Sequence, residues 1–475
     1  MYINLEPIQN DMAGLIGREL ELEEMEERYS SSGFRTLAIM GRRRIGKTFL
    51  INEFCKDKPH LILTAVEGSY KSSILSFDRS IDEYLDIEGT ESRDFLDITK
   101  RLGSLKTDKT RLVIVIDEYT YLSEADPASN SFLQIFIDHK LPEMNAFLIV
   151  SGSLVGVMKD ALLDDKGPLY KRFLGPMHIK ELSYTKCREF HPHMSEEDQL
   201  RIYSMVGGVP LYHEIMNYDT AEDCVKKRLL GSYASLREEA NYIVSRELNP
   251  ISYYLDILRA ISGGSTSGKE IAEKVGIEND LCNRYLKKME TLGIIELKMP
   301  MCGANRREKL YRVIDNLIKL YNDVIIPNIT SVSNDDIDYA YRSIEEPLKQ
   351  FYGPAFEDIC RQYVMKHHRC KEIGSWWGKI VGESTDIDIV ALCEENGMEY
   401  HLICECKFRN KQTGLREMKE LERRSEYLKN CYNKRFCLFS RMGFTDELEE
   451  YAESFGIELV DPKKMFEPWS NRNKQ

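Results

Sequence analysis

The sequence predicts a multidomain α/β protein, and three observations lead to this expectation. Its 475 residues are too many for a single domain. Apolar runs at residues 36–40 and 111–119 have the composition of buried strands, and each is followed by glycine or by acidic residues. Further along, residues 386–393 and 399–408 have the pattern of two strands joined by a short turn. We therefore expect sheets in both halves of the chain.

Composition limits the classes of function. The chain is 42% hydrophobic and 30% charged, with a formal net charge of −13. This acidic total argues against a general nucleic-acid coat and leaves a local basic patch open. The N-terminus lacks the basic start and apolar core of a signal peptide, and no run of about 18 apolar residues predicts a membrane span. The 12 cysteines show no framework spacing. We expect a cytoplasmic protein with reduced thiols.

The cysteines near the C-terminus receive a structural interpretation. Cys404 and Cys406 flank Glu405, and no second C-x-C or C-x-x-C pair accompanies them. A lone C-x-C of this kind favours structural cysteines over metal ligands.

The first apolar run leads into a phosphate-binding pattern. Residues 41–48, GRRRIGKT, fit G-x-x-x-x-G-K-[ST], and a helical pattern follows. Gly41 and Gly46 let backbone N–H groups turn inward around phosphate oxygens, and the helix N-terminus adds partial positive charge. Lys47 would bridge the β- and γ-phosphates, and Thr48 would ligate Mg²⁺. The sequence therefore predicts a P-loop nucleotide-binding fold, with a parallel sheet and flanking helices. We assign Arg42–Arg44 no catalytic role.

The second apolar run supplies the acids that such a site needs. It ends in Asp117 and Glu118, and the C-terminal end of an interior parallel strand faces the ligand crevice. Asp117 would hold Mg²⁺ through water, and Glu118 would polarise the attacking water. A third run, residues 145–153, ends in small hydroxyl residues. Ser151 or Ser153 is a candidate sensor of the γ-phosphate, and a simple strand-to-helix turn explains the same residues equally well.

Residues 250–315 predict a winged helix. A first helix is expected in ISYYLDILRAIS, a second after the capping-box pair Ser267 and Glu270, and two wing strands in IIELKM and EKLYRVI, with Arg306 and Arg307 at the tip. The third helix, ENDLCNRYLKKMETLG, has an apolar face and a basic face. The expected apolar face is Leu281, Tyr285, Met289 and Leu292, and the basic face is Arg284, Lys287 and Lys288.

Two roles for this winged helix stay open. The third helix could enter a DNA groove, or the unit could be a packing module between its neighbours. Residues 251–315 contain 11 Lys and Arg against 9 Asp and Glu, a surplus of two. Because this surplus is small for a DNA reader, we favour the packing role.

The last part of the chain contains a second candidate metal site. Glu405 and Lys407 are two residues apart and so project from one face of a strand, which Asp388 would meet from the antiparallel neighbour. Asp388 and Glu405 would hold Mg²⁺, Glu357 would add a ligand from the helix GPAFEDICRQYVMKH, and Lys407 would orient the water that the metal activates. Asp386 is an alternate ligand. Solvated acids and lysines on paired strands are the simpler explanation.

Several phrases occur in an order that resembles a known family. They are Gly17–Glu19 in IGRELELEEM, GRRRIGKT, the strand ending in DEY, LYKR at 169–172 and GGVPLY at 207–212. Together they resemble the archaeal-type ATPases of the STAND/AAA+ group, which are also common in bacteria, over about the first half of the chain. The resemblance implies ATP as the nucleotide, a GRE segment near the adenine, and a GxP motif, Gly208 and Pro210, in a helical lid. Arg172 aligns with the arginine of the family's LYGR phrase, with Lys171 in place of the glycine, and is a candidate arginine finger.

The C-terminal pattern resembles a second family. Asp388, Glu405 and Lys407 follow the D-x(n)-E-x-K order of the PD-(D/E)xK nuclease superfamily, with Ile387 in place of the proline. A domain with the phrases WWG and ECK commonly follows this ATPase family. The resemblance therefore implies a C-terminal α/β restriction-endonuclease-like domain.

These predictions combine into one domain organisation and three functional hypotheses. The expected domains are a P-loop ATPase core (1–180), a helical lid (181–249), a winged helix (250–315), a helical linker (316–350) and a PD-(D/E)xK nuclease-like domain (351–475). The leading hypothesis is an ATP-hydrolysing switch coupled to a DNA-associated, metal-dependent nuclease domain, with ATP, Mg²⁺ and DNA as ligands. One alternative is an ATP-dependent DNA- or protein-binding regulator whose C-terminal domain is inert. Another is a signalling ATPase that assembles into homo-oligomers.

Overall fold

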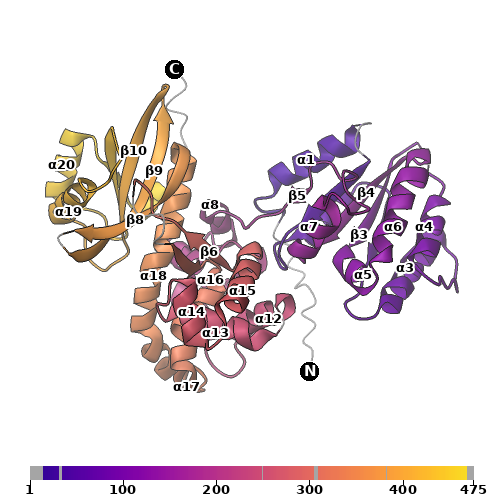
Figure 1. The fold of residues 1–475 in the computed structure, drawn as a ribbon, viewed down its shortest axis with the longest axis horizontal. Helices are drawn as coiled ribbons and strands as arrows, with labels where there is room; N and C mark the ends of the chain where they lie inside the picture. The colour runs from indigo at the N-terminus through magenta and orange to yellow at the C-terminus, as the bar shows by residue number, and fades with distance from the viewer. Residues whose placement is uncertain are drawn as a thin grey trace. The chain divides into compact units, whose positions relative to one another are not determined.

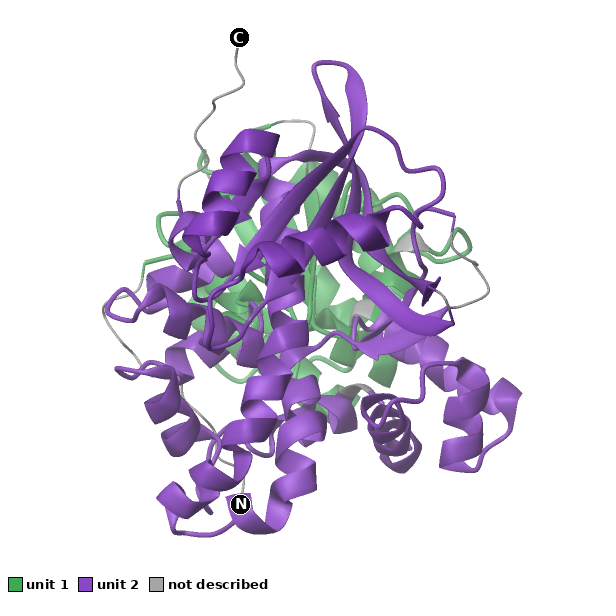
Figure 2. Ribbon diagram, turned by 90° about the vertical axis from the view of Figure 1, so that its left-hand side faces the viewer, with its two compact units in different colours: residues 1–182, 209–211 green, residues 183–208, 212–475 purple. Residues whose placement is uncertain are grey.

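The computed structural model describes residues 14–31, 35–107, 109–248, 250–303, 309–380 and 382–467 (Figure 1). The chain divides into two compact units. Unit 1 holds residues 1–182 and 209–211, and unit 2 holds residues 183–208 and 212–475 (Figure 2). A short internal segment, residues 209–211, is thus grouped with unit 1, while the chain on both sides of it is grouped with unit 2.

Unit 1 is built on a five-stranded parallel sheet of order β2-β3-β4-β1-β5. The strands are β1 (Thr36–Met40), β2 (His60–Thr64), β3 (Leu112–Asp117), β4 (Ala146–Gly152) and β5 (Met177–His178). β1, β3 and β4 are buried along their whole length, as the continuous apolar runs predict for interior parallel strands. Because β4 lies between β1 and β3, the polar residues that follow these three strands meet at one edge of the sheet.

Helices cover both faces of this sheet, which confirms the predicted P-loop fold. Side chains of Ala38, Ile114 and Leu148 form one core with residues of α3 (Tyr70–Leu85), α4 (Phe95–Gly103), α5 (Tyr119–Ala125), α6 (Ala128–Ile135) and α7 (Val155–Leu163). On the other face, Phe147 of β4 packs against rings from α1 (Glu19–Ser30) and α2 (Lys47–Cys55). Neighbouring residues of each strand point to opposite faces, so both layers of helices are needed to bury the sheet.

Unit 2 begins with a helical region. It contains α8 (Tyr184–Cys187), α9 (Glu196–Val206), most of α10 (Pro210–Ile215), α11 (Ala221–Arg228) and α12 (Glu239–Glu247). Two buried histidines lie in this region. His191 Nε2 is 2.8 Å from His213 Nδ1, and His213 Nε2 is 2.7 Å from the carbonyl oxygen of Gly207. This chain of contacts fixes the backbone just before the GxP motif.

The winged helix follows, with all its predicted elements. They are α13 (Ile251–Ser262), α14 (Gly268–Val275), α15 (Asn279–Thr291) and the antiparallel wing strands β6 (Ile295–Lys298) and β7 (Leu310–Val313). The predicted capping box of Ser267 and Glu270 begins α14. Arg306 and Arg307 lie outside the described residues.

The predicted apolar face of α15 is partly wrong. Its buried residues are Cys282, Leu286 and Met289, whereas Leu281, Tyr285 and Leu292 are half-buried. The helix is rotated toward α13, where Tyr285 packs on Tyr254 at 4.7 Å between ring centroids.

The connection to the C-terminal region is more helical than predicted. After α16 (Asn316–Leu320) and α17 (Ile329–Val332), the single helix α18 runs over Ile337–His367. A helix starting at Gly353 was expected, but α18 passes through both Pro347 and Pro354. A proline inside a helix costs about 3 kcal/mol. The buried stripe of α18 continues on both sides of the prolines and offsets this cost through packing.

A mixed five-stranded sheet of order β12-β11-β10-β9-β8 forms the C-terminal region. β8 (Arg369–Ile380), β9 (Glu383–Glu395) and β10 (Met398–Lys407) are antiparallel neighbours, and β11 (Lys434–Ser440) and β12 (Glu458–Val460) continue in parallel. The helices α19 (Leu415–Ser425), α20 (Asp446–Phe455) and α21 (Pro462–Met465) complete it. The expected pair of strands around the EENGM turn is confirmed as β9 and β10. No described helix has the length and apolarity needed to cross a membrane.

Candidate nucleotide site and carboxylate cluster

Two glycines shape the phosphate loop that follows β1. A Cβ atom at Gly41 would lie 2.7 Å from the carbonyl oxygen of Ile179, so no other residue fits there. Gly46 has a φ of +91° and begins α2, in a backbone conformation that glycine adopts without strain. The two glycines of the sequence pattern are therefore required by a close backbone approach and by a left-handed turn.

Lys47 and Thr48 point into the loop and toward β3. Lys47 Nζ donates to the carbonyl oxygens of Gly41, at 2.9 Å, and Arg42, at 3.1 Å. Thr48 Oγ1 donates to Asp117 Oδ2 at 2.9 Å. Ser151 Oγ, at the end of β4, donates to the other oxygen of the same carboxylate. The structure thus brings the predicted magnesium ligands Thr48 and Asp117 into direct contact.

Glu118 follows Asp117 in a strained conformation. Its φ is +53°, which is uncommon for a residue other than glycine and costs on the order of 1 kcal/mol. Its carboxylate accepts hydrogen bonds from Ser153 Oγ at 2.6 Å and from the Ser153 N–H at 3.1 Å. Glu118 and Ser153, two residues predicted from separate strands, are therefore partners. Ser151 binds Asp117, so the two candidate sensors have different partners.

Arg18 holds the backbone of the phosphate loop in place, and the sequence reasoning missed this contact. Arg18, of the GRE segment, is only 4% exposed, and its guanidinium donates to the carbonyl oxygens of Ile45, at 3.0 Å, and Lys180, at 2.8 Å. It therefore fixes the carbonyl just before Gly46. The family resemblance pointed to this segment through the nucleotide base, and nothing in the local sequence indicates the contact with the loop.

Arg172 is not brought to the phosphate loop. Its guanidinium forms two hydrogen bonds with the carboxylate of Asp138, at 2.9 and 2.7 Å. Its carbonyl oxygen accepts a hydrogen bond from Thr36 Oγ1 at 2.6 Å. Thr36 begins β1 and the phosphate loop follows the other end of this five-residue strand, about 15 Å away. The backbone of Arg172 is thus held at the opposite end of the strand from the phosphate loop.

The C-terminal sheet brings the predicted acidic residues together. The register of β9 and β10 pairs Ile389 with Cys404, which places Asp388 beside Glu405. Asp388 Oδ2 accepts a hydrogen bond from the Cys406 N–H at 2.7 Å. Burial, together with the nearby carboxylates of Glu405 and Glu357, raises the pKa of Asp388 to about 8. Burial also raises the pKa of Glu357. Three carboxyl groups therefore share one poorly solvated region.

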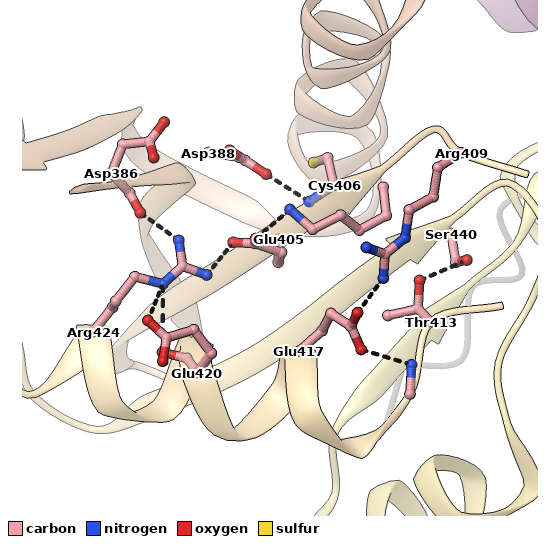
Figure 3. Close-up of polar contacts among 12 residues, drawn as sticks. Asp386, Asp388, Glu405, Cys406, Arg409, Thr413, Glu417, Glu420, Arg424 and Ser440 are labelled. Carbon is pink, nitrogen blue, oxygen red and sulfur yellow. Dashed lines mark hydrogen bonds and ion pairs between the residues drawn. The ribbon is translucent and has the colours of Figure 1, made fainter. Parts of the chain in front are cut away.

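Glu405 is held by two cations (Figure 3). Lys407 Nζ donates to one carboxylate oxygen, and Arg424 Nη2 of α19 donates to the other at 2.8 Å. Arg424 also donates to the carbonyl oxygen of Asp386 at 2.6 Å, so it links β9 to β10. Sequence reasoning missed Arg424, because its helix follows the predicted motif and no spacing rule connects the two.

The three predicted ligands are close but are not gathered around one point. Among the described residues, only Cys302, His401 and Cys431 form a group of three whose metal-ligating atoms all lie within 4.8 Å of one another. Glu357, Asp388 and Glu405 do not reach this spacing. A cation bound by all three would therefore require these carboxylates to move, and Glu405 to leave Arg424.

The fold and the first site define a P-loop ATPase domain, and comparison with known proteins agrees. Residues 15–214 match the family described as an ATPase domain predominantly from Archaea. Residues 255–296 match a winged helix-turn-helix DNA-binding family, and residues 321–422 match a family of archaeal and bacterial proteins of unknown function. The inferred resemblance to archaeal-type ATPases is confirmed, and the resemblance of the C-terminal domain to the PD-(D/E)xK nuclease superfamily stays a prediction. The chain carries an archaeal-type ATPase domain, a winged helix and a C-terminal α/β domain whose family has no assigned function.

Individual relatives extend over most of the chain. An uncharacterized protein of Methanocaldococcus jannaschii is 28% identical over 385 residues, which is 79% of this chain and 84% of that protein. A solved Walker-type ATPase of Pyrococcus abyssi is 18% identical with a TM-score of 0.45, over 65% of this chain and 96% of that one. A solved STAND protein of Pyrococcus horikoshii, with a tetratricopeptide repeat sensor, is 16% identical with a TM-score of 0.29, over 76% of this chain and 51% of that one.

Proposed function

We propose that this chain is a switch ATPase that binds and hydrolyses ATP with Mg²⁺. The observation that carries the proposal is the network at the ends of β1, β3 and β4, in which Thr48 and Ser151 bind Asp117 while Ser153 binds Glu118. A hydroxyl and a carboxylate in contact are the hard oxygen donors that Mg²⁺ prefers, so these residues fit the ion. When bound, the ion would neutralise charge on the phosphates.

Each residue of the network has a defined task in this proposal. Lys47 exchanges the loop carbonyls for phosphate oxygens, which gives its ammonium group an anionic partner. Ser153 turns its hydroxyl to the γ-phosphate and so releases the carboxylate of Glu118. The released carboxylate orients the attacking water and accepts its proton. Hydrolysis restores the contact between Ser153 and Glu118. This hydrogen bond is therefore absent with ATP bound and present after hydrolysis.

The chain itself offers a route from this site to the second unit. Pro210 belongs to unit 1, and its Cγ lies 4.0 Å from where a Cβ on Gly46 would be. The residues on either side of Val209–Leu211 belong to unit 2 and continue into helices of the proposed lid, residues 181–249. A rearrangement of the phosphate loop would therefore act on a segment that is covalently continuous with the lid. Ordering of such a segment by the γ-phosphate is a common switching mechanism.

The switch is tested by separating ATP binding from hydrolysis. The variant Glu118→Gln keeps a side-chain oxygen for Ser153 but no longer accepts a proton. We expect ATP affinity within about threefold of the natural protein and a hydrolysis rate at least about 100-fold lower. The matched control is Glu143→Gln, which changes an exposed acid of the same unit. Equal hydrolysis by Glu118→Gln and the natural protein would remove Glu118 from the mechanism.

The composition favoured a packing role for the winged helix, but residues 255–296 match a DNA-binding family, and we therefore propose that α15 contacts DNA. Arg284, Lys287 and Lys288 are all exposed on this helix. Contacts to phosphates release counterions, and each one lost reduces the slope of log K against log[salt] by about 0.9. Changing all three residues to alanine should therefore weaken DNA binding and flatten its salt dependence, whereas Lys349→Ala on α18 should not. An unchanged slope would leave the winged helix as a packing module.

A second candidate function is Mg²⁺-dependent phosphodiester cleavage at the C-terminal carboxylates. In its favour, Glu405 and Glu357 both act to raise the pKa of Asp388, and a bound divalent cation would relieve this mutual repulsion. Against it, Arg424 and Lys407 already neutralise Glu405. The alternative is a regulator with an inert C-terminal domain.

Cleavage of DNA with Mg²⁺ and ATP should be lost in Lys407→Ala and kept in Lys411→Ala. Equal cleavage by Lys407→Ala and the natural protein would favour the regulator.

Arg172 gives a reason to expect self-association. Its position at the far end of β1 excludes it from the phosphate loop of its own chain, so a finger role requires a neighbouring copy. We propose that ATP promotes a homo-oligomer in which Arg172 faces the nucleotide of the adjacent chain. Light scattering should show a larger mass with a non-hydrolysable ATP analogue than without it. A monomer under both conditions would remove the finger.

A further inference from the structure

A cysteine–histidine–cysteine group lies apart from both sites described above. Cys302 comes from the segment that follows wing strand β6, His401 from β10, and Cys431 from the turn that precedes β11. One ligand atom of each lies within 4.8 Å of the other two. We propose that these three residues bind Zn²⁺ and thereby clasp the wing of the winged helix onto the C-terminal sheet.

The donor atoms select the metal. Two thiolates and an imidazole are ligands for zinc, whereas Mg²⁺ and Ca²⁺ prefer oxygen donors. In a tetrahedral site with zinc–sulfur bonds of about 2.3 Å, two sulfurs lie about 3.8 Å apart. The present spacing of at most 4.8 Å therefore requires a contraction of about 1 Å or less. Cys302 and Cys431 are both half-buried, so water can occupy the fourth position.

His401 has a backbone partner on one ring nitrogen. It is 5% exposed, and its Nδ1 lies 3.2 Å from the carbonyl oxygen and 3.3 Å from the backbone nitrogen of Tyr432. The tautomer with its proton on Nδ1 donates to this carbonyl and keeps the lone pair of Nε2 for zinc. Metal-bound histidines usually have such a backbone or carboxylate partner on the other ring nitrogen.

The backbone at Cys302 is a second, independent observation. Its φ is +56°, and Gly303 follows with a φ of +73°. Glycine or asparagine adopts this conformation at lower cost, whereas other residues lose about 1–2 kcal/mol. A cysteine at this position therefore lowers the stability of the fold unless its sulfur makes a compensating interaction, such as a bond to a metal. Filling the apolar cluster around Trp376, which Cys302 and Cys431 also contact, would not require a histidine nitrogen beside the sulfurs.

The backbone around Cys302 already rests on the C-terminal domain. The Met301 N–H donates to the carbonyl oxygen of Ser375 on β8 at 2.9 Å, and the Lys429 N–H donates to the carbonyl oxygen of Cys302 at 3.0 Å. Zinc would add bonds to β10 and to the turn before β11. The wing and the sheet would then move as one body, and loss of the metal would release the wing.

The proposal is tested on the full-length, untagged, reduced protein with Co²⁺ as the probe. We expect one Co²⁺ per chain and a thiolate-to-cobalt charge-transfer band. The band should lose about half its intensity in Cys302→Ser and in Cys431→Ser, and zinc added afterwards should abolish it. The matched control is Cys370→Ser, which changes another close thiol pair, with Cys370 and Cys393 sulfurs 3.4 Å apart. This control should keep the full band.

A second measurement reports on the clasp itself. Hydrogen exchange at residues 299–303 should be slower with zinc than with a chelator in the natural protein, and equal under both conditions in Cys302→Ser. Absence of the cobalt band in the natural protein would overturn the proposal. So would a band that keeps its full intensity in Cys302→Ser, or a Cys302–Cys431 disulfide in protein isolated without reductant. None of these outcomes depends on ATP hydrolysis.

Discussion

Both units place a carboxylate at the end of a strand, but the partners of the two carboxylates differ. In unit 1, Asp117 accepts hydrogen bonds from the hydroxyls of Thr48 and Ser151. In unit 2, Glu405 accepts hydrogen bonds from the cations of Lys407 and Arg424. Hydroxyl partners leave the negative charge in place, whereas an ammonium and a guanidinium neutralise it. The comparison teaches that similar acidic motifs differ in how readily they accept a metal.

Because of this difference, the site in unit 1 can bind a metal as it stands, whereas the site in unit 2 must first lose a cation. We call the carboxylate cluster of unit 2 the closed site for this reason. Mg²⁺ can join Thr48 and Asp117 without displacing any cation. At Glu405 a metal must compete with the buried ion pair to Arg424 and the half-buried pair to Lys407, and breaking a buried pair costs several kcal/mol. We therefore expect nucleotide binding to need no activation, and metal binding in unit 2 to depend on what happens to Arg424.

The largest effect is expected at the phosphate loop. Lys47→Ala removes the only ammonium group that donates within the loop among the described contacts, so ATP binding should weaken by at least about 100-fold, or about 2.7 kcal/mol. Calorimetry with ATP and Mg²⁺ measures this. Lys56→Ala, an exposed lysine just after α2, is the control and should bind normally. Undiminished ATP affinity in Lys47→Ala would mean that the nucleotide binds elsewhere.

The second effect tests whether Arg424 closes the carboxylate cluster. Arg424→Gln removes the buried guanidinium from Glu405, so the affinity of unit 2 for Mn²⁺ should rise by about 10-fold. Mn²⁺ binding is followed by calorimetry on the full chain, with the metal ligands of the nucleotide site removed by Thr48→Ala and Asp117→Ala. Arg423→Gln is the matched control, because this exposed neighbour pairs with Glu420 instead. Equal Mn²⁺ affinity in both arginine variants would show that Arg424 is not the barrier.

The third effect is a pH dependence that belongs to the closed site. The pKa of Asp388 is raised to about 8, so between about pH 4 and pH 8 the folded protein holds a proton that the unfolded chain has lost. This contribution to stability is complete below pH 4 and is lost as the pH rises toward 8. Without metal, Asp388→Asn should therefore melt about 2 °C higher than the natural protein at pH 8, or roughly 1 kcal/mol. At pH 4 the two proteins should melt at the same temperature.

The exposed carboxyl group two residues earlier provides the control. Asp386→Asn changes the same strand and should leave the melting temperature unchanged at both pH values. Melting in EDTA, followed by circular dichroism, is sufficient for the comparison. If the melting temperatures of Asp388→Asn and the natural protein change with pH in the same way between pH 4 and pH 8, the carboxyl group of Asp388 is ionised at neutral pH. The site would then be more accessible to a metal than we infer.

The elements of both sites could be predicted from the sequence, because local patterns determine them. Gly46 is required by a left-handed turn within the loop itself, and the buried strands are continuous apolar runs. Gly41 is required by a contact with the distant Ile179, and the phosphate-loop pattern predicted this glycine without predicting the contact. The register of β9 and β10 follows from one short turn, which is why Asp388 and Glu405 were expected to meet. The predicted roles of these residues stay predictions.

The contacts that distinguish the two sites could not be predicted, because they join distant parts of the chain. Arg424 reaches Glu405 from a helix that begins after the motif has ended. The continuation of α18 through Pro354 depends on packing that outweighs a local helix-breaking signal. Cys302 meets His401 only because the wing rests on the C-terminal sheet, and no cysteine spacing reports this.

The smallest effect concerns the loop that carries the candidate finger in unit 1. Lys171 has a φ of +60°, at the position where the family phrase LYGR has glycine. Relief of the left-handed strain favours Lys171→Gly, and the greater freedom of glycine in the unfolded chain opposes it. We expect a net gain on the order of 0.5 kcal/mol in the free energy of unfolding.

Lys171→Ala keeps the strain and should be about 1 kcal/mol less stable than Lys171→Gly. Urea unfolding of the three proteins measures the difference, and an alanine variant at least as stable as the glycine variant would show that Lys171 leaves this conformation in solution.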